Sequence, residues 1–353
     1  MTDAISVKRK AVLAGKPFNI LWLQAGSCGG CTMSVLEAGS RNLFDELQVL
    51  GAHLLWHPAL SEATGRDVQD LLNDIINGDV YLDALCIEGA VMTGPKGSGK
   101  FQMVAGLGKP MAEVIRDLAA RARYVVGIGT CATYGGIPAA GGSIGEATGL
   151  QYLDDSIGGL LGADFVSSEG LPVINISGCA PHPGWIMETI SVLTYGDFSA
   201  EDLDALGRPR FISNHLAHHG CDRNEFYEFK ASAATLSDRG CLMENLGCKA
   251  TQASGDCNLR AWNGEGSCTK GGFSCIACTA PAFQNIRNYH ETPKVAGIPV
   301  GLPVDMPKAW FVALAALSKS ATPERVRRNA HADHVVVPPG RVPGPRSDKG
   351  DKS

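Results

Sequence analysis

The sequence predicts a doubly wound parallel α/β domain followed by an irregular, cysteine-rich domain. Up to about residue 196, short β-rich runs alternate with helical patterns. These runs are apolar almost throughout, which is typical of parallel sheets buried on both faces. From residue 197 the alternation stops, and seven of the 12 cysteines fall between Cys221 and Cys278.

Five strands and four main helices are expected in the α/β domain. The strands are expected at residues 18–24, 52–56, 84–88, 124–129 and 172–177, all short runs rich in apolar and β-forming residues. Apolar residues recur at helical spacing over residues 32–50, 67–76, 110–121 and 183–193, which predicts the helices. Pro110 and Pro183 stand in first turns, where proline is favoured.

The chain divides into four expected segments. An N-terminal arm (1–17) precedes the α/β domain (18–196), and the irregular domain (197–320) precedes an extended C-terminal tail rich in proline and charge (321–353). The irregular domain has too few strand signals for a conventional core. We therefore expect metal ligation to supply its cross-links.

Composition excludes several classes of protein. The 353 residues are 44% hydrophobic, so the chain is not disordered, and a net charge of −5 without a basic stripe argues against nucleic acid as a partner. The apolar run at 309–317 is too short to cross a membrane, and no adjacent arginine pair opens an export leader. We expect a cytoplasmic protein, with peripheral membrane association as the alternative. In that compartment, metal or iron–sulfur ligation explains clustered cysteines better than disulfides do.

Four cysteines of the first half share one position in the predicted sheet. Cys28 and Cys31 follow the first strand, Cys131 follows the fourth, Cys179 follows the fifth, and Glu88 ends the third. Ligands of open parallel sheets bind at the carboxyl ends of the strands, so we expect these groups to converge there. Four thiolates suit a [4Fe–4S] cluster or zinc. The remaining alternatives are a redox pair at the Cys-x2-Cys motif and inert burial of the later two thiols.

The second half carries two further ligand groups. One group combines an imidazole with three thiols: His218, Cys221, Cys241 and Cys248. The other has four thiols within 22 residues, interspersed with glycines: Cys257, Cys268, Cys275 and Cys278. A zinc ribbon and an iron–sulfur cluster suit the second spacing about equally. Three groups in one chain favour electron transfer, because a protein rarely needs three zinc staples.

Two other features are expected to carry no chemistry. Cys86 lies within the third strand, so we expect a buried, inert thiol. The segment 94–100 looks like a phosphate-binding loop, but Phe101 replaces the hydroxyl residue that would bind magnesium.

The motifs together resemble the small subunit of nickel–iron hydrogenases. The resemblance covers residues 18–281, is most similar to the actinobacterial-type high-affinity uptake branch, and rests on motifs in the family's order: Trp22-x5-Cys28-Gly-Gly-Cys31-Thr, Glu88-Gly, Gly-Thr-Cys131-Ala-Thr-Tyr-Gly-Gly, Gly-Cys179-Ala-Pro-His-Pro, His218-x2-Cys221 and Cys257-x17-Cys275-x2-Cys278. It implies a flavodoxin-like first domain and an iron–sulfur second domain.

The resemblance also implies three [4Fe–4S] clusters. The proximal one would take Cys28, Cys31, Cys131 and Cys179, with Glu88 beside it; the medial one Cys257, Cys268, Cys275 and Cys278; and the distal one His218, Cys221, Cys241 and Cys248. Many relatives have proline in place of Cys268 and a three-iron medial cluster, so a fourth thiol implies four irons. Gly29 and Gly30 stand between the first two ligands, where oxygen-tolerant membrane-bound relatives have an extra cysteine.

The implied activity is hydrogen oxidation shared with a partner. An obligate large subunit would hold the nickel–iron centre, and the present chain would contain no catalytic residue of its own. Electrons would leave through the three clusters to an acceptor protein or a quinone, and the heterodimers would form a higher oligomer.

Overall fold

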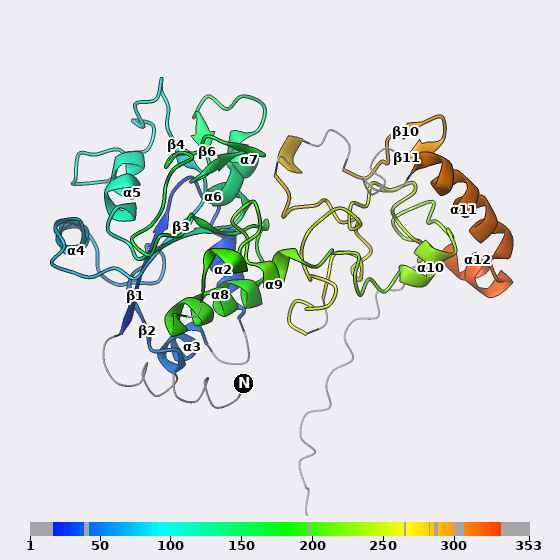
Figure 1. The fold of residues 1–353 in the computed structure, drawn as a ribbon, viewed down its shortest axis with the longest axis horizontal. Coiled ribbons are helices and arrows are strands. Elements are labelled where there is room, and N and C mark those ends of the chain that lie inside the picture. Colours follow the sequence, from blue (N-terminus) through cyan, green and yellow to red (C-terminus); the bar gives the residue numbers. More distant parts are fainter. Residues whose placement is uncertain are drawn as a thin grey trace, which may run out of the picture.

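The computed structural model describes residues 17–38, 42–196, 198–264, 266–281, 283–285, 289–299 and 307–332. It shows a sheet-containing lobe and an irregular lobe (Figure 1). The expected N-terminal arm lies outside the described residues except for residue 17.

A five-stranded parallel sheet forms the centre of the first lobe. Its strand order is β2-β1-β3-β5-β9, which is the flavodoxin-like order. The strands are β1 (Phe18–Gln24), β2 (Ala52–Trp56), β3 (Ala84–Glu88), β5 (Tyr124–Ile128) and β9 (Ile174–Ile176). Their predicted positions are confirmed to within two residues at each end.

The register aligns the carboxyl ends of four strands. Gln24 pairs with Glu88, Glu88 with Ile128, and Ile128 with Ile176. Residues that follow these strands therefore start from one edge of the sheet, and every expected ligand of the first half follows or ends one of them.

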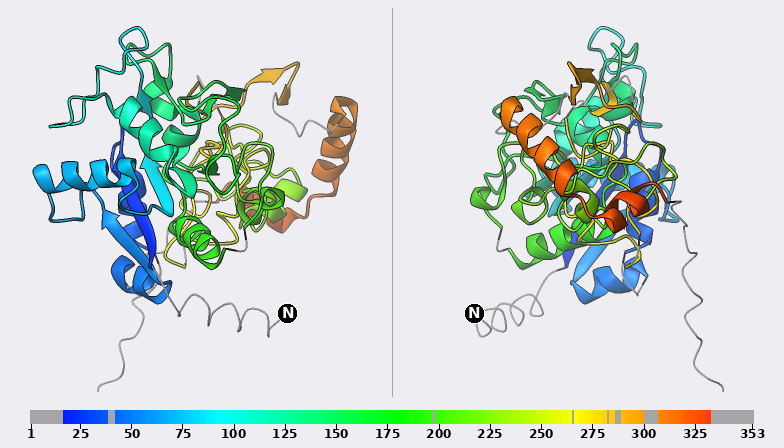
Figure 2. Two further views of the ribbon diagram at one scale, coloured as in Figure 1. Left: turned by 60° about the vertical axis from the view of Figure 1, so that its left-hand side comes forward. Right: turned by 90° about the vertical axis from the view of Figure 1, so that its right-hand side faces the viewer.

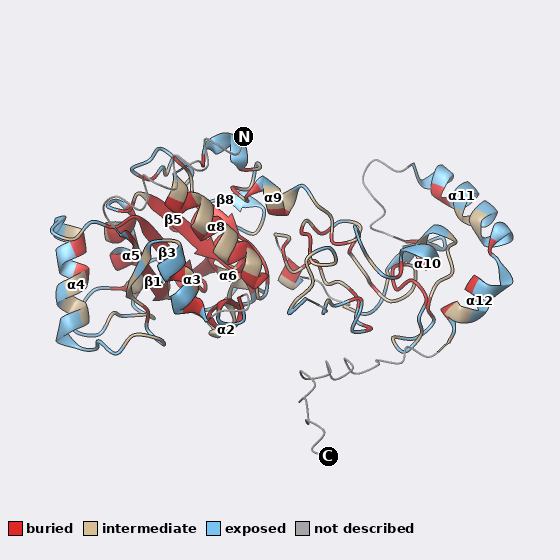
Figure 3. Ribbon diagram, turned by 90° about the horizontal axis from the view of Figure 1, so that it is seen from below, coloured by how far each residue is buried: buried red, intermediate tan, exposed pale blue. Residues whose placement is uncertain are grey.

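Helices cover both faces of the sheet and bury two apolar clusters. One cluster packs α3 (Leu43–Val49) and α8 (Pro183–Tyr195) through residues such as Leu47 and Ile186. The other packs α4 (Arg66–Asn77) and α5 (Met111–Ala119) through residues such as Ile75 and Ile115. Helical spacing of these apolar residues places them on the inward faces, as Figure 3 shows in red.

One predicted helix is wrong in extent. The pattern over 32–50 forms two helices, α2 (Gly30–Leu36) and α3, with Glu37 as the C-cap of the first. The Asn42 side chain accepts the Asp45 backbone N–H at 3.0 Å and caps the start of α3. The apolar spacing alone did not reveal this restart.

Short elements connect the main ones. In the first lobe these are α6 (Thr130–Tyr134), α7 (Gly136–Ala139) and two antiparallel strand pairs, β4 (Val91–Met92) with β6 (Ala147–Thr148) and β7 (Tyr152–Leu153) with β8 (Ser156–Ile157). The connection to the second lobe carries η1 (Ala200–Asp202) and α9 (Arg210–Ser213).

The second lobe is mostly turns and loops, as predicted. Its described elements are α10 (Asn224–Glu228), η2 (Phe283–Asn285), β10 (Lys294–Val295), β11 (Ile298–Pro299), α11 (Lys308–Ala321) and α12 (Glu324–Ala330). Figures 1 and 2 place α11 and α12 at the end of this lobe away from the sheet.

The expected extended tail is wrong where the structure describes it. Residues Glu324–Ala330 form α12, which begins directly after Pro323. Val326 and Ala330, one turn apart, are buried in a small cluster with Phe226 and Phe311. The proline-rich composition masked this short amphipathic turn, and residues 333–353 lie outside the described residues. None of the described helices has the length and hydrophobicity needed to cross a membrane.

Candidate metal centres

Four cysteines and one glutamate gather at the carboxyl edge of the sheet; we call them the sheet-edge set. Burial raises the pKa of the Cys31 thiol well above its usual value, and nearby negative charge on Glu88, Cys131, Cys28 and Cys179 raises it further. The structure therefore brings together the side chains that the strand ends predicted. Cys28 and Cys179 are exposed, so the set reaches the surface of this chain.

Glycine is required where the backbone passes these sulfurs. A Cβ on Gly129 would stand 2.5 Å from the Sγ of Cys31, and one on Gly136 would stand 2.9 Å from the Sγ of Cys131. Both glycines also have positive φ, at +87° and +54°. The Gly-Thr-Cys-Ala-Thr-Tyr-Gly-Gly motif thus makes room for its own thiol and for a neighbouring one.

The Glu88 carboxylate is fully buried and held by five donors. Oε1 accepts the Ser27 hydroxyl at 2.8 Å and the Cys31 backbone N–H at 3.2 Å. Oε2 accepts hydrogen bonds from three further side chains: Trp22 Nε1, Gln24 Nε2 and Thr32 Oγ1. Burial favours a higher pKa, but the hydrogen bonds outweigh it and lower the pKa of Glu88 below its usual value. Glu88 is therefore a fixed negative charge next to a ligand loop.

A second set of thiols lies within the irregular lobe; we call it the middle set. It comprises Cys257, Cys268, Cys275 and Cys278. Burial, followed by negative charge on Cys278 and Cys268, raises the pKa of Cys257 to about 12. Burial raises the pKa of Cys275 as well, and charge on Cys278 and Cys257 adds to the rise. The structure therefore brings all four predicted thiols together.

The third set lines a small cavity of about 20 Å³; we call it the outer set. Its members are His218, Cys221, Cys241 and Cys248. Burial lowers the pKa of His218, which favours the neutral imidazole that a metal ligand needs. The His218 ring packs edge-on against Tyr227, with ring centroids 4.4 Å apart. His215 and His219 contact each other and do not line the cavity.

The three sets adjoin in one order. Burial raises the pKa of Cys278, and negative charge on Cys179 adds a smaller rise, so the sheet-edge set adjoins the middle set. Burial raises the pKa of Cys275 as well, and charge on Cys248 adds to it, so the middle set adjoins the outer set. Hydrogen bonds follow the same order: Thr130 Oγ1 donates to the Cys278 carbonyl at 2.5 Å, and the Lys249 N–H donates to the Cys275 carbonyl at 2.8 Å.

The donor chemistry fits iron–sulfur groups. Burial raises the pKa of Cys131 to about 11 and of Cys241 to about 12, so these thiols ionise only when bound positive charge compensates the desolvation. Eleven thiols and one neutral imidazole match the ligands that such groups take. Among the described residues, no three His, Cys, Asp or Glu side chains stand close enough to share a single metal ion.

Sequence reasoning missed one residue of this region. Thr130 is buried, accepts the Gly178 N–H at 2.9 Å and donates to Cys278, so it joins the sheet edge to the irregular lobe. Its position next to Cys131 was the only sequence signal, because the partners lie 48 and 148 residues away.

The two features expected to carry no chemistry have their own structural explanations. Cys86 is fully buried in β3, and burial raises the pKa of its thiol to about 12. In the phosphate-loop look-alike, the backbone N–H groups of Lys96 and Gly97 already donate to the Glu146 carboxylate. That carboxylate occupies the amides that a phosphate would need.

Comparison with known proteins identifies the family. Residues 28–193 match the family described as NADH ubiquinone oxidoreductase, 20 Kd subunit, and residues 214–290 match the family of the C-terminal region of NiFe/NiFeSe hydrogenase small subunits. The F420 non-reducing hydrogenase II small subunit of Methanosarcina mazei is 32% identical over 335 residues, which cover 88% of this chain and 84% of the relative. The chain belongs to the nickel–iron hydrogenase small-subunit family. Such hydrogenase small subunits are iron–sulfur proteins that pair with a nickel–iron large subunit.

Other hydrogenase small subunits support the same membership. The periplasmic [NiFeSe] hydrogenase small subunit of Desulfomicrobium baculatum is 31% identical over 286 residues, or 75% of this chain and 84% of the relative. The actinobacterial-type NiFe-hydrogenase from Ralstonia eutropha H16 is similar in structure, with a TM-score of 0.71 and 28% identity over 88% of this chain and 93% of that one. The predicted family, and the predicted parallel α/β sheet followed by an iron–sulfur domain, are confirmed.

Proposed function

We propose that this protein carries electrons away from hydrogen oxidation through three [4Fe–4S] clusters. The sheet-edge, middle and outer sets would hold the proximal, medial and distal clusters respectively. One observation carries the proposal: contacts join the three sets in a single order from the sheet edge to the far lobe, through Thr130 and Cys278 and then through the cluster on which Cys275 and Cys248 both pack. When bound, the clusters supply one-electron transfer, which these side chains alone cannot perform.

The protein controls the charge around each set. Glu88 places a fixed negative charge by the Cys31 loop, which favours the more oxidised state of a group bound there. His218 supplies a neutral ligand in the outer set, so that set carries one negative charge fewer than four thiolates would. Cys257, Cys275 and Cys278 of the middle set are partly buried, whereas Cys268 is exposed. The Cys278 carbonyl accepts a hydrogen bond from Thr130 of the first lobe, so the middle set lies against the sheet edge.

The sheet edge offers a surface for the large subunit. Cys28 is exposed there, and the helix that follows it, α2, leaves Met33 65% and Leu36 40% exposed. Exposed apolar side chains next to a ligand set indicate a protein interface. We propose that this edge is covered by the large subunit, which brings its nickel–iron centre near the sheet-edge set, and that the heterodimers assemble further.

We place the enzyme in the cytoplasm, working in the direction of hydrogen uptake. The acceptor, a protein or a quinone, would receive electrons near His218. The similar small subunit of Desulfomicrobium baculatum is described as periplasmic, so the location of the native complex should be measured by fractionation of cells.

Metal analysis of the chain purified with its large partner tests the proposal. We expect about twelve irons per small subunit, as three clusters of four require, and little zinc. Hydrogen-dependent reduction of a viologen dye should accompany them. Cys131→Ser should lower the iron content, whereas Cys86→Ala, which alters a thiol outside the three sets, should not.

Two alternatives give different results. A zinc-stapled binding protein would be colourless, with zinc near stoichiometric amounts and no hydrogen-dependent dye reduction. A quinone- or deazaflavin-linked oxidoreductase subunit would contain iron but fail to use hydrogen. The match of residues 28–193 to the 20 Kd subunit family is compatible with both this alternative and a hydrogenase. The match of residues 214–290 to hydrogenase small subunits favours the hydrogenase.

A further inference from the structure

A basic pocket lies beside the outer set. It is open to solvent and has a volume of about 380 Å³ between the loop after α10 and the helices α11 and α12. Three basic side chains line it, those of Lys230, Lys319 and Arg327, and His331 lines it as well. Glu244 is the only carboxylate among the lining residues that the structure describes, and it pairs with Lys319 at 2.8 Å. Outside the lining, Glu324 lies 3.7 Å from Arg327 and Asp238 lies 3.8 Å from His331. The lining residues themselves therefore carry more positive than negative charge, and Lys230 is the lining cation with no carboxylate partner among these ion pairs.

Lys230 holds an unusual position in this pocket. Its backbone has a φ of +52°, in the left-handed region where glycine normally ends a helix. A lysine in that conformation is less favourable than a glycine would be. The side chain is half-buried, and burial lowers its pKa; negative charge on Cys241, Glu228 and Glu244 offsets only part of this effect. A bound anion would supply the missing compensation.

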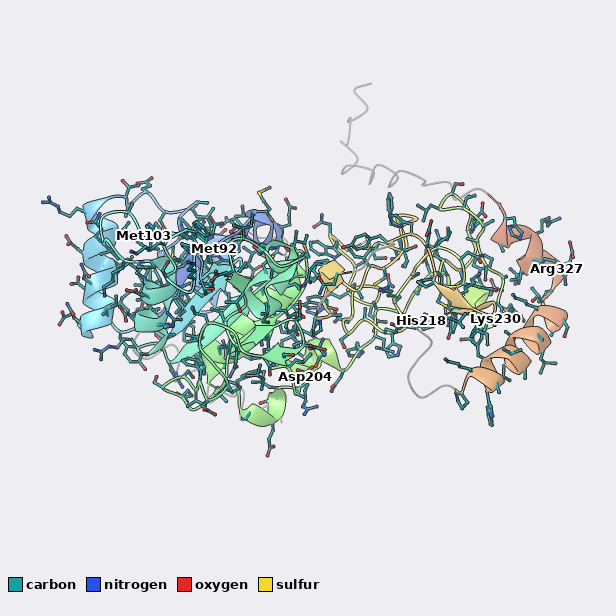
Figure 4. All side chains as sticks on the ribbon, turned by 90° about the horizontal axis from the view of Figure 1, so that it is seen from above. Met92, Met103, Asp204, His218, Lys230 and Arg327 are labelled. Atoms are coloured by element: carbon teal, nitrogen blue, oxygen red, sulfur yellow. The ribbon has the colours of Figure 1, made fainter. Side chains whose placement is uncertain are left out.

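The Tyr227 ring connects the Lys230 side chain to the outer set. The Lys230 Nζ stands 3.7 Å from the centroid of the Tyr227 ring, and that ring packs on the ring of His218. Figure 4 shows Lys230, His218 and Arg327 in the same lobe, far from Met92 and Met103. A molecule in the pocket would thus lie one aromatic ring away from an outer-set ligand.

We propose that this pocket binds a small polyanion and holds anionic electron acceptors next to His218. The inference rests on the proposed electron route, because the pocket would select the acceptor to which that route delivers its electrons. Each hydrogen molecule consumed at the large subunit yields two protons and two electrons. An anionic one-electron acceptor would therefore be reduced twice for each hydrogen molecule.

Steady-state kinetics of the complete hydrogenase test the pocket with two dyes of opposite charge. Ferricyanide is a trianion that becomes ferrocyanide on taking one electron, and methyl viologen is a dication. Lys230→Gln should raise the KM for ferricyanide about ten-fold, because one nearby charge is lost, and leave the viologen rate unchanged. Arg327→Gln should give a smaller rise, and Lys230→Arg should restore binding. Pyrophosphate should compete with ferricyanide but not with viologen.

Controls separate this inference from the electron route itself. Lys308→Gln removes an equal charge from an exposed residue of α11 that does not line the pocket, so it should change neither KM. Equal ferricyanide KM values in the parent, Lys230→Gln and Arg327→Gln, or inhibition by pyrophosphate of both dyes alike, would overturn the pocket assignment. A parent enzyme that contains iron but does not reduce viologen with hydrogen would instead refute the electron route.

Discussion

Replacing Thr130 by valine removes a hydroxyl that joins the two lobes while keeping the shape of the side chain. The Thr130 Oγ1 accepts the Gly178 N–H and donates to the Cys278 carbonyl, and Thr130 is 1% exposed. Valine leaves both backbone groups buried without these partners. Each unsatisfied group costs about 1–3 kcal/mol, so the local cost is about 2–6 kcal/mol.

Hydrogen–deuterium exchange of the complete enzyme, read by mass spectrometry, measures this cost. At 1.4 kcal/mol per factor of ten, the amide of Gly178 should exchange about 30-fold to 10⁴-fold faster in Thr130→Val. Thr130→Ser keeps the hydroxyl and loses one methyl group, worth about 0.8 kcal/mol, so its exchange should rise about four-fold or less. Equal exchange rates in the valine variant and the parent would show that the Thr130 hydroxyl does not contribute this free energy.

Three further substitutions test the ligand sets. Cys268→Pro removes one thiolate corner of the middle set, so magnetic resonance should show a three-iron signal there, and unchanged four-iron spectra would contradict the assignment. His218→Ala should slow dye reduction several-fold without loss of hydrogen binding in the large subunit, as measured by isotope exchange, and parent-like turnover would argue against an exit at His218. Glu88→Gln removes a buried negative charge, so the reduction potential of the sheet-edge group should rise by tens of millivolts with iron content unchanged; a constant potential would mean that the Glu88 charge does not reach it.

The parallel sheet was predictable because its strands are short, apolar runs separated by helical patterns. Gathering of the sheet-edge set followed from the same information, since strand ends of a parallel sheet share an edge. The eight later ligands could be grouped from their order along the chain, but the spacing of cysteines in an irregular segment suits zinc and iron alike. The presence of three groups favoured iron, and the family resemblance assigned the groups to named clusters.

The remaining features depend on contacts that spacing does not encode. The break between α2 and α3 is set by the Asn42 cap, while the apolar spacing continues across it. Helix α12 is stabilised by burial of Val326 and Ala330 against distant aromatic residues, in a stretch whose composition indicated an extended chain. The role of Thr130 depends on two backbone partners far away in sequence.

The spacing of the ligands along the chain has a consequence for biogenesis. Cys28 follows the first strand of the sheet and Cys179 follows the last one. All five strands must therefore be synthesised and folded before iron can be bound at that edge. The ligands from His218 to Cys278 occupy one short, loop-rich stretch. There, metal delivery would drive chain compaction rather than follow it, so iron starvation should expose the irregular lobe to proteases while the sheet persists.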